Sequence, residues 1–229
     1  MPILIFQTVL NMTNNTFQHL IEKGDYEGLK TALGKDSSLA NKTIHWHLNQ
    51  DNQSDPLHYI ADCVFNGHLR NEMEGEITEL FLKHGAEING SKGRETPLIG
   101  AISLGSYLTA AVLIKAGAEL ESTSVFGARA LHWAAWMGMS ETVELLLSAG
   151  AEIEHKCSEY SATPLFWAVH GNSPHGPKVK NQQVKCAELL IQAGAQVNTV
   201  NKQRLSAINL AKSSEDKAMN KLLNMTLKM

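Results

Sequence analysis

Residues 129–154 contain the pattern that decides the fold, and they read Arg129-Ala-Leu-His-Trp-Ala-Ala-Trp-Met-Gly-Met-Ser-Glu-Thr-Val-Glu-Leu-Leu-Leu-Ser-Ala-Gly-Ala-Glu-Ile-Glu154. Gly138 separates two apolar runs, and the second run places Val143, Leu146 and Leu147 at helical spacing. The alanines of the first run are small enough to let neighbouring helices pack closely. The stretch therefore predicts two short helices that are joined by a tight turn and closed by a glycine.

The two ends of this stretch recur along the chain. The closing phrase, Leu147-Ser-Ala-Gly-Ala-Glu-Ile-Glu154, returns at intervals of 32, 33 and 44 residues, with its glycine at Gly85, Gly117, Gly150 and Gly194. The opening phrase, Arg129-Ala-Leu-His132, has counterparts at Asp55-Pro-Leu-His58, Thr96-Pro-Leu-Ile99 and Thr163-Pro-Leu-Phe166, with a weak fifth at Ser206-Ala-Ile-Asn209. Two phrases in fixed alternation indicate an internal repeat.

Each phrase has a physical role at the end of a helix. Thr96 and Thr163 precede a proline, and this order is typical of an N-cap followed by proline at the first helical position, where the missing N–H costs nothing. Asp55 before Pro56 predicts the same cap. The glycine after the second helix allows the left-handed C-cap conformation, which a side chain opposes.

These phrases resemble the ankyrin repeat, whose Thr-Pro-Leu-His-x-Ala opening and period of about 33 residues they reproduce. The resemblance runs from about Phe17 to Leu223, and it implies an all-α solenoid of about six stacked helix-turn-helix units with projecting β-turn fingers. We expect terminal tails at 1–15 and 224–229. Between them we expect repeats at 16–53, 54–94, 95–127, 128–161, 162–204 and 205–223, of which the first is degenerate and the last is a truncated cap.

Two of the expected repeats are longer than the others. The opening leucine and the closing glycine are separated by 19 positions in Leu98–Gly117 and Leu131–Gly150, but by 28 and 29 positions in Leu57–Gly85 and Leu165–Gly194. Each long repeat therefore carries an insertion, which we expect near the turn between its two helices, at 66–75 and 172–181. Such insertions are often neutral, but they also map to binding faces.

Composition excludes several functions. The 229 residues carry a formal net charge of −3, which disfavours nucleic-acid binding because such proteins normally present a basic face. No segment approaches the ~20 consecutive apolar residues of a membrane span. The three cysteines, Cys63, Cys157 and Cys186, are scattered and odd in number, which suits a reducing compartment. We expect no nucleic-acid partner, no membrane segment and a cytoplasmic protein, or one delivered outside the cell if it is an effector.

No catalytic motif stands out. The chain has no Gly-x-Ser-x-Gly elbow, no phosphate-binding glycine-rich loop and no His-Glu-x-x-His pair. The alternative is a metal-binding or enzymatic protein that uses His45, His47 and His175, because on a strand His45 and His47 would face one side. No acidic residue or cysteine flanks this pair, so we favour a non-enzymatic protein without a cofactor. The resemblance implies that His58 and His132, in the histidine position of the opening phrase, form hydrogen bonds that tie adjacent fingers together.

Aromatic residues are concentrated in expected repeats four and five. Trp133 and Trp167 follow the histidine position, which is usually part of the interior, so we expect them in the core. By the resemblance, Trp136 and Met137 fall at positions that face the concave groove, where their equivalents include Leu104 and His170. An exposed Trp-Met pair is typical of an interface anchor.

The finger tips extend this set of residues. Alignment of the repeats places Phe126 and Tyr160 at the tips of the fingers on either side of repeat four. We expect one aromatic patch, with Leu104 and His170 at its edges, that consists of Phe126, Trp136, Met137 and Tyr160. The alternative is that this patch packs against the N-terminal tail or a second copy of the chain.

The sequence therefore predicts a stand-alone, monomeric adaptor or inhibitor. We expect it to bind an unidentified partner protein through the concave groove and the finger tips of repeats three to five. The resemblance implies this role, because many ankyrin-like proteins mask the active surface of a partner. The partner itself does not follow from the fold.

Overall fold

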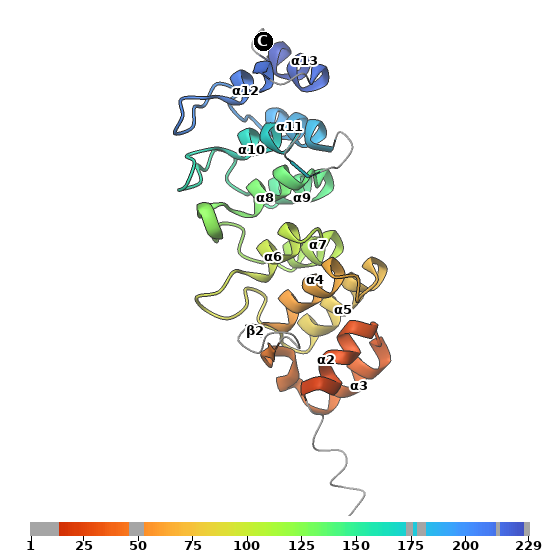
Figure 1. Cartoon of the computed structure of the whole chain (residues 1–229). Helices are drawn as coiled ribbons and strands as arrows, with labels where there is room; N and C mark the ends of the chain where they lie inside the picture. The colour runs from red at the N-terminus through yellow and green to blue at the C-terminus, as the bar shows by residue number, and fades with distance from the viewer. Residues whose placement is uncertain (1–13, 46–52, 173–175, 178–181, 214–215, 227–229) are drawn as a thin grey trace, which may run out of the picture.

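The computed structural model describes residues 14–45, 53–172, 176–177, 182–213 and 216–226. Within them the chain forms twelve α-helices. The helices come in pairs that stack in chain order, from α2 and α3 at one end to α12 and α13 at the other (Figure 1). The loops between successive pairs project to one side of the stack as fingers (Figure 1). This arrangement confirms the predicted all-α solenoid, while the borders of the individual repeats stay a prediction.

The helix bounds show how regular the stack is. The pairs are α2 (Asn14–Lys23) with α3 (Tyr26–Lys35), α4 (Pro56–Phe65) with α5 (Asn71–Lys83), α6 (Pro97–Ser103) with α7 (Tyr107–Lys115), α8 (Ala130–Met137) with α9 (Ser140–Ser148), α10 (Pro164–Gly171) with α11 (Gln182–Gln192), and α12 (Ala207–Ser213) with α13 (Lys217–Thr226). A 3₁₀ helix at Ser37–Asn41 follows α3, and a second lies in a finger at Val125–Gly127. Strands β1 (Ile44–His45) and β2 (Gln53–Ser54) pair antiparallel, with Ile44 opposite Ser54.

Threonine caps begin two of these helices as predicted. The hydroxyl oxygens of Thr96 and Thr163 each accept a hydrogen bond at 3.4 Å from the backbone N–H three residues further on. The cap predicted for Asp55 is wrong in one respect, because Asp55 precedes α4 but forms no side-chain cap hydrogen bond. Its carboxylate instead accepts from the backbone N–H and the hydroxyl of Ser91, at 2.7 and 2.6 Å. The next finger offers two donors, so the carboxylate joins neighbouring fingers.

The closing glycines have the predicted backbone conformation. Their φ angles are 86°, 88°, 90° and 104° for Gly85, Gly117, Gly150 and Gly194. This left-handed region favours glycine, because a side chain there clashes with the backbone. The repeated glycine therefore ends the second helix of four successive pairs in the same way.

The two insertions differ in what they add. Helices α4 and α5 have 10 and 13 residues, against 7 and 9 in α6 and α7, so the first insertion partly lengthens helices. Residues 71–75 of the expected insertion belong to α5. The second insertion lies between α10 and α11, and most of it falls outside the described residues.

A continuous apolar core runs through the stack, with a smaller cluster beneath the fingers. The leucines of the opening phrases, Leu57, Leu98, Leu131 and Leu165, are all fully buried in the main core. The smaller cluster consists of Ala128, Cys157, Ala162, Phe166 and Trp167. It supports the fingers around α8 and α10, where the candidate site lies.

The cysteines and the helix lengths can be compared with the sequence. Cys63, Cys157 and Cys186 are all buried and free. Among the residues described, no helix has the length and apolar character needed to cross a membrane.

Candidate functional site

A pocket of about 470 Å³ opens where α8, α10 and α12 meet the fingers beside them. Helix α8 contributes Trp133 and Trp136, and α10 contributes Phe166, Trp167 and His170. The other lining residues come from α12 and three finger segments: Phe126, Tyr160, Ala162, Asn201, Gln203, Leu205 and Leu210. None of these residues is Asp, Glu, Lys or Arg. The site is therefore an apolar pocket with mainly aromatic walls.

The rings of the walls contact one another in a continuous series. Trp167 lies at the centre, with its ring centroid 5.3 Å from that of Trp133 and 6.1 Å from that of Trp136. Both pairs are close to edge to face, at 74° and 73°, which is a favourable arrangement of aromatic rings. The Trp136 ring lies 5.0 Å from that of His170, which lies 6.4 Å from that of Phe166. Each ring thus limits the movement of the next.

Phe126 is held at the rim by a strained backbone. Its φ angle is +66°, which is rare for a bulky side chain. The Phe126 carbonyl accepts hydrogen bonds from the backbone N–H of Glu159 at 3.0 Å and from the hydroxyl of Ser158 at 3.2 Å. The ring packs 5.7 Å from that of Tyr160 and 6.4 Å from that of Trp133. Because neighbouring groups fix both backbone and ring, this part of the rim is preformed.

The finger between α11 and α12 closes the pocket on a third side. Asn201 organises it, because its side-chain oxygen accepts from the backbone N–H groups of Gln203 and Leu205, at 2.9 and 3.0 Å. The backbone N–H of Lys202 donates to the carbonyl of Tyr160 at 2.9 Å, which joins this finger to the preceding one. Gln203 and Leu205 then line the pocket beside Tyr160.

Polar groups in the pocket are few. The indole N–H of Trp133 donates to the hydroxyl of Ser124 at 2.7 Å. Among the described residues, the indole N–H groups of Trp136 and Trp167 have no acceptor. An apolar ligand with a few polar atoms matches such walls, whereas a strongly hydrated ligand would lose water contacts that the walls do not replace.

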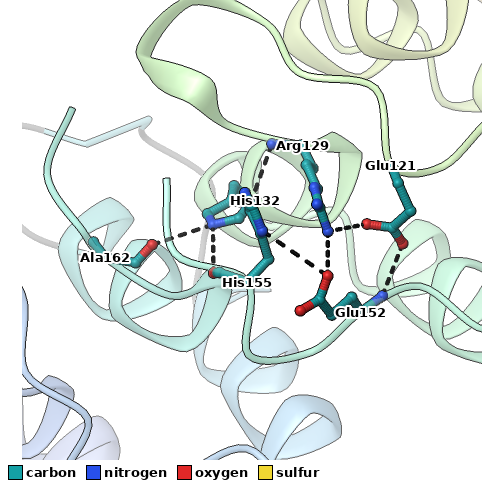
Figure 2. Close-up of polar contacts among 6 residues, drawn as sticks. All are labelled: Glu121, Arg129, His132, Glu152, His155 and Ala162. Carbon is teal, nitrogen blue, oxygen red and sulfur yellow. Dashed lines mark hydrogen bonds and ion pairs between the residues drawn. The ribbon is translucent and has the colours of Figure 1, made fainter. Parts of the chain in front are cut away.

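A polar network joins the loop before α8 to the loop before α10 (Figure 2). The guanidinium of Arg129 contacts the carboxylates of Glu121 and Glu152, and the backbone N–H of Glu152 donates to Glu121 at 2.9 Å. The Arg129 guanidinium lowers the pKa of the exposed Glu152 carboxyl. His155 approaches the Glu152 carboxylate at 3.9 Å. The network connects two successive loops, the one between α7 and α8 and the one between α9 and α10.

His132 is the buried centre of this region. Its Nδ1 accepts from the backbone N–H of Arg129 at 3.2 Å, and its Nε2 lies 3.1 and 3.2 Å from the carbonyls of His155 and Ala162 (Figure 2). Burial lowers the pKa of His132 to about 4, so the ring is neutral and Nε2 carries the proton. The predicted role of His132 in tying fingers together is confirmed. His58 instead packs its ring against Gly100, where a Cβ would come within 2.7 Å of the imidazole.

The structure brings four of the six predicted patch residues together. Phe126, Trp136, Tyr160 and His170 all line the pocket. Leu104 is not among the lining residues and packs against the main core. Met137 is also not a lining residue, and its methyl group lies near Gly105. That the four lining residues bind a partner stays a prediction.

Several lining residues were not predicted as part of the site. Trp167 is 8% exposed and belongs to the core as expected, yet one side of it lines the pocket, and so does the half-buried Trp133. Phe166 occupies the histidine position of its repeat, and this departure from the pattern is a sequence signal that could have drawn attention to it. The alignment of the repeats that places Phe126 and Tyr160 at finger tips also places Gln203 at one. The contribution of Leu205 depends on how the third finger folds, and no sequence pattern indicated it.

The alternative histidine site is only partly within the described residues. His45 lies in β1, opposite Gln53, whereas His47 and His175 fall outside the described residues. Within the part of the chain that the structure describes, no group of three or more His, Cys, Asp or Glu side chains is placed to hold a metal ion.

Comparison with known proteins identifies the repeat. The family model for ankyrin repeats (3 copies) matches residues 73–157 and 122–201, which together span more than half of the chain. The site lies within this span except for the residues of α12 and the end of the third finger. The match therefore covers the part of the chain that builds most of the pocket.

Three curated relatives share a limited region with the chain. It is similar to Inversin of Gallus gallus, at 31% identity over 93 residues, or 41% of this chain and 8% of that protein. It is similar to Palmitoyltransferase ZDHHC13 of Homo sapiens, at 27% identity over 114 residues, or 50% of this chain and 17% of that protein. It is similar to Ankyrin repeat and SOCS box protein 6 of Mus musculus, at 28% identity over 141 residues, or 61% of this chain and 32% of that protein. The matched region spans less than a third of the length of each relative.

Proposed function

The chain belongs to the ankyrin repeat family, and on that premise we propose that it is a non-enzymatic module that binds a partner protein through the aromatic pocket and the finger tips around it. Ankyrin repeats are protein-interaction modules, and the family is generally non-enzymatic. The observation that carries the proposal is the pocket itself, because the exposed Phe126 and Tyr160 and the half-buried Trp133 and Trp136 line one opening.

The composition of the rim supports a binding role. Phe126, Tyr160 and Leu205 are 42%, 40% and 41% exposed, although each is a large apolar side chain. They lie on three successive fingers around one opening. Contiguous apolar surface of this kind is unfavourable in water and typical of interaction sites. Trp and Tyr are also the residues that most often dominate binding energy at protein interfaces.

The rigidity of the site also supports the proposal. The carbonyl of Phe126 and the side chain of Asn201 each accept two hydrogen bonds that fix finger tips. Ring contacts fix Trp136 against Trp167 and His170. A preformed site loses less conformational entropy when it binds. We also propose that the repeat domain spans residues 16–223 and that the protein acts as a monomer. We propose a reducing compartment such as the cytoplasm as its location.

Affinity capture with matched variants tests this proposal. Wild type and a variant with Phe126→Ala, Trp136→Ala and Tyr160→Ala are compared as baits, after circular dichroism has shown that both are folded. Tyr107→Ala is the control, because Tyr107 is 49% exposed on α7 and is not among the pocket residues. A protein that wild type and Tyr107→Ala retain and the triple variant loses supports the proposal. A protein retained equally by all three places binding elsewhere on the molecule.

A further inference from the structure

We propose that the partner presents an acidic segment with a bulky apolar side chain, and that the apolar side chain enters the aromatic pocket while the acidic residues face the basic tip formed by Lys202 and Arg204. This inference rests on the proposed function and names the chemistry of the partner. The inference depends on the charged residues beside the pocket, because the aromatic walls alone do not indicate the charge of the partner.

The basic tip adjoins the pocket through the chain itself. Lys202 and Arg204 are exposed and flank Gln203, which lines the pocket, and Leu205 follows as a second lining residue. Neither side chain forms an ion pair with any described residue. Lys156, on the preceding finger, donates to the carbonyl of Val200 at 3.2 Å and adds a third positive charge. That preceding finger carries Glu159 at its tip and Glu154, whose carboxylate accepts from the backbone N–H of Gln196 and the hydroxyl of Thr199, at 3.0 and 3.1 Å. The three basic side chains therefore still leave positive charge in excess.

The backbone of Arg204 supplies a second observation. Three successive fingers have a residue with positive φ three positions before the first residue of the helix that follows. These residues are Gly127, Ser161 and Arg204, with φ angles of 65°, 49° and 60°. Glycine is the residue that this conformation favours, and Gly127 meets that preference. Arginine there is strained, and strain of this kind is found at functional sites, where other demands on the residue outweigh it. An unpaired arginine at a position suited to glycine therefore indicates a use for its charge.

The pocket and the tip together define the ligand. The pocket offers no charged side chain, so it suits a neutral, bulky side chain of the partner. Lys202 and Arg204 attract carboxylates on either side of that side chain, because opposite charges at the rim of an interface favour association. A basic segment would be repelled there. This complementarity favours an acidic partner although the whole chain carries a net charge of −3.

Two dyes that differ by one charge test the inference. Anilinonaphthalene sulfonate carries an aromatic body and an anionic group, and N-phenylnaphthylamine is its neutral analogue. We expect wild type to bind the sulfonate about three- to tenfold more tightly at low salt, as two exposed charge contacts provide. The difference should disappear in a variant with Lys202→Gln and Arg204→Gly. It should persist in Lys115→Gln, which removes an exposed basic residue at the end of α7. Equal affinity of wild type for both dyes would overturn the inference.

Peptides extend the same test to the proposed partner. The acidic peptide Asp-Glu-Asp-Phe-Asp-Glu-Asp should displace the bound sulfonate dye at about three- to tenfold lower concentration than Asn-Gln-Asn-Phe-Asn-Gln-Asn. The preference should weaken as salt rises, because exposed charges are screened over about 8 Å at physiological ionic strength. Equal displacement by the two peptides would overturn the acidic partner.

Failure of the inference can be told apart from failure of the proposed function. Trp136→Ala should weaken both dyes, since Trp136 is part of the wall. If both dyes bind equally and both depend on Trp136, the pocket stands and the acidic partner is wrong. If Trp136→Ala changes the affinity of neither dye, the pocket itself is wrong as the binding site. Arg204→Gly also relieves backbone strain, so an unchanged or raised melting temperature shows that lost binding is not lost folding.

Discussion

The indole rings of Trp133 on α8 and Trp167 on α10 meet edge to face, with centroids 5.3 Å apart and planes at 74°. These residues come from successive helix pairs, so the wall of the pocket is also part of the packing between pairs. Trp167 is nearly buried, whereas Trp133 and Trp136 are half-buried. Variants of the pocket should therefore divide into those that mainly change stability and those that mainly change binding.

Trp167→Ala should lower the free energy of unfolding by about 3–5 kcal/mol, because it removes a large buried ring from the contact between α8 and α10. Trp136→Ala should cost less than half as much, since Trp136 keeps part of its surface in solvent. Urea unfolding followed by circular dichroism measures both values. Equal losses in the two variants would contradict the central position of Trp167.

Stability should fall as the pH is lowered from about 6.5 to about 4, and His132 should account for part of this loss. Burial lowers the pKa of His132 to about 4 from the ordinary 6.5. In this window the unfolded chain binds a proton that the folded chain does not, so protonation favours unfolding. The contribution is about 3 kcal/mol if the unfolded value is ordinary. Unfolding of wild type and His132→Gln, measured from pH 7 to pH 4, should show a smaller decline in the variant. The same decline in both proteins would exclude His132 as the cause.

Gly171→Ala should destabilise the protein by about 1–3 kcal/mol, because a side chain there overpacks the contact between α10 and α8. A Cβ at Gly171 would lie 2.5 Å from the carbonyl oxygen of Trp136, which is backbone and can move only with its helix. Gly34→Ala is the matched control, since a Cβ at Gly34 in α3 meets nothing within 4 Å. That substitution should stabilise the helix by roughly 0.5 kcal/mol. Thermal unfolding of both variants should shift in opposite directions, and a shift in the same direction would contradict the close approach at Gly171.

The cysteines should be unreactive in the folded protein. All three are buried, and burial raises the pKa of Cys63 and of Cys186 to about 12. Disulfide reagents attack the thiolate, which is scarce at such a pKa and shielded by the core. At pH 8 the native protein should react slowly with an aromatic disulfide reagent, and the unfolded protein should release three equivalents at once. Rapid reaction of a native thiol would show that the stack opens locally.

The fold could be predicted from the sequence because each repeated phrase fixes its own backbone. Thr96 and Thr163 each cap a helix by accepting a hydrogen bond from the backbone N–H three residues further on. Gly85 and Gly150 each end a helix by adopting a positive φ angle. Such effects depend on neighbouring residues only. Asp55 is the exception, because its carboxylate accepts hydrogen bonds from Ser91 in the next finger and not from the backbone of the helix that it precedes.

The candidate site could be predicted only in part, because its walls depend on how the repeats stack. The family pattern placed Trp136 and His170 correctly near one another, and their rings lie 5.0 Å apart. The same pattern placed Leu104 in the patch, where the structure instead packs it against the core. Trp167 packs in the core on one side and lines the pocket on the other. The sequence pattern assigns each helix position either to the core or to the surface, so it does not predict this double role.

The central claim is that the aromatic pocket is the surface that binds the partner. The most direct measurement is the dissociation constant of the purified, captured partner for wild type and for Trp136→Ala, with both proteins shown to be folded. We predict a loss of at least about tenfold, or about 1.4 kcal/mol, as expected for a tryptophan at the centre of an interface. A change of less than about 1 kcal/mol in the binding free energy would contradict the claim.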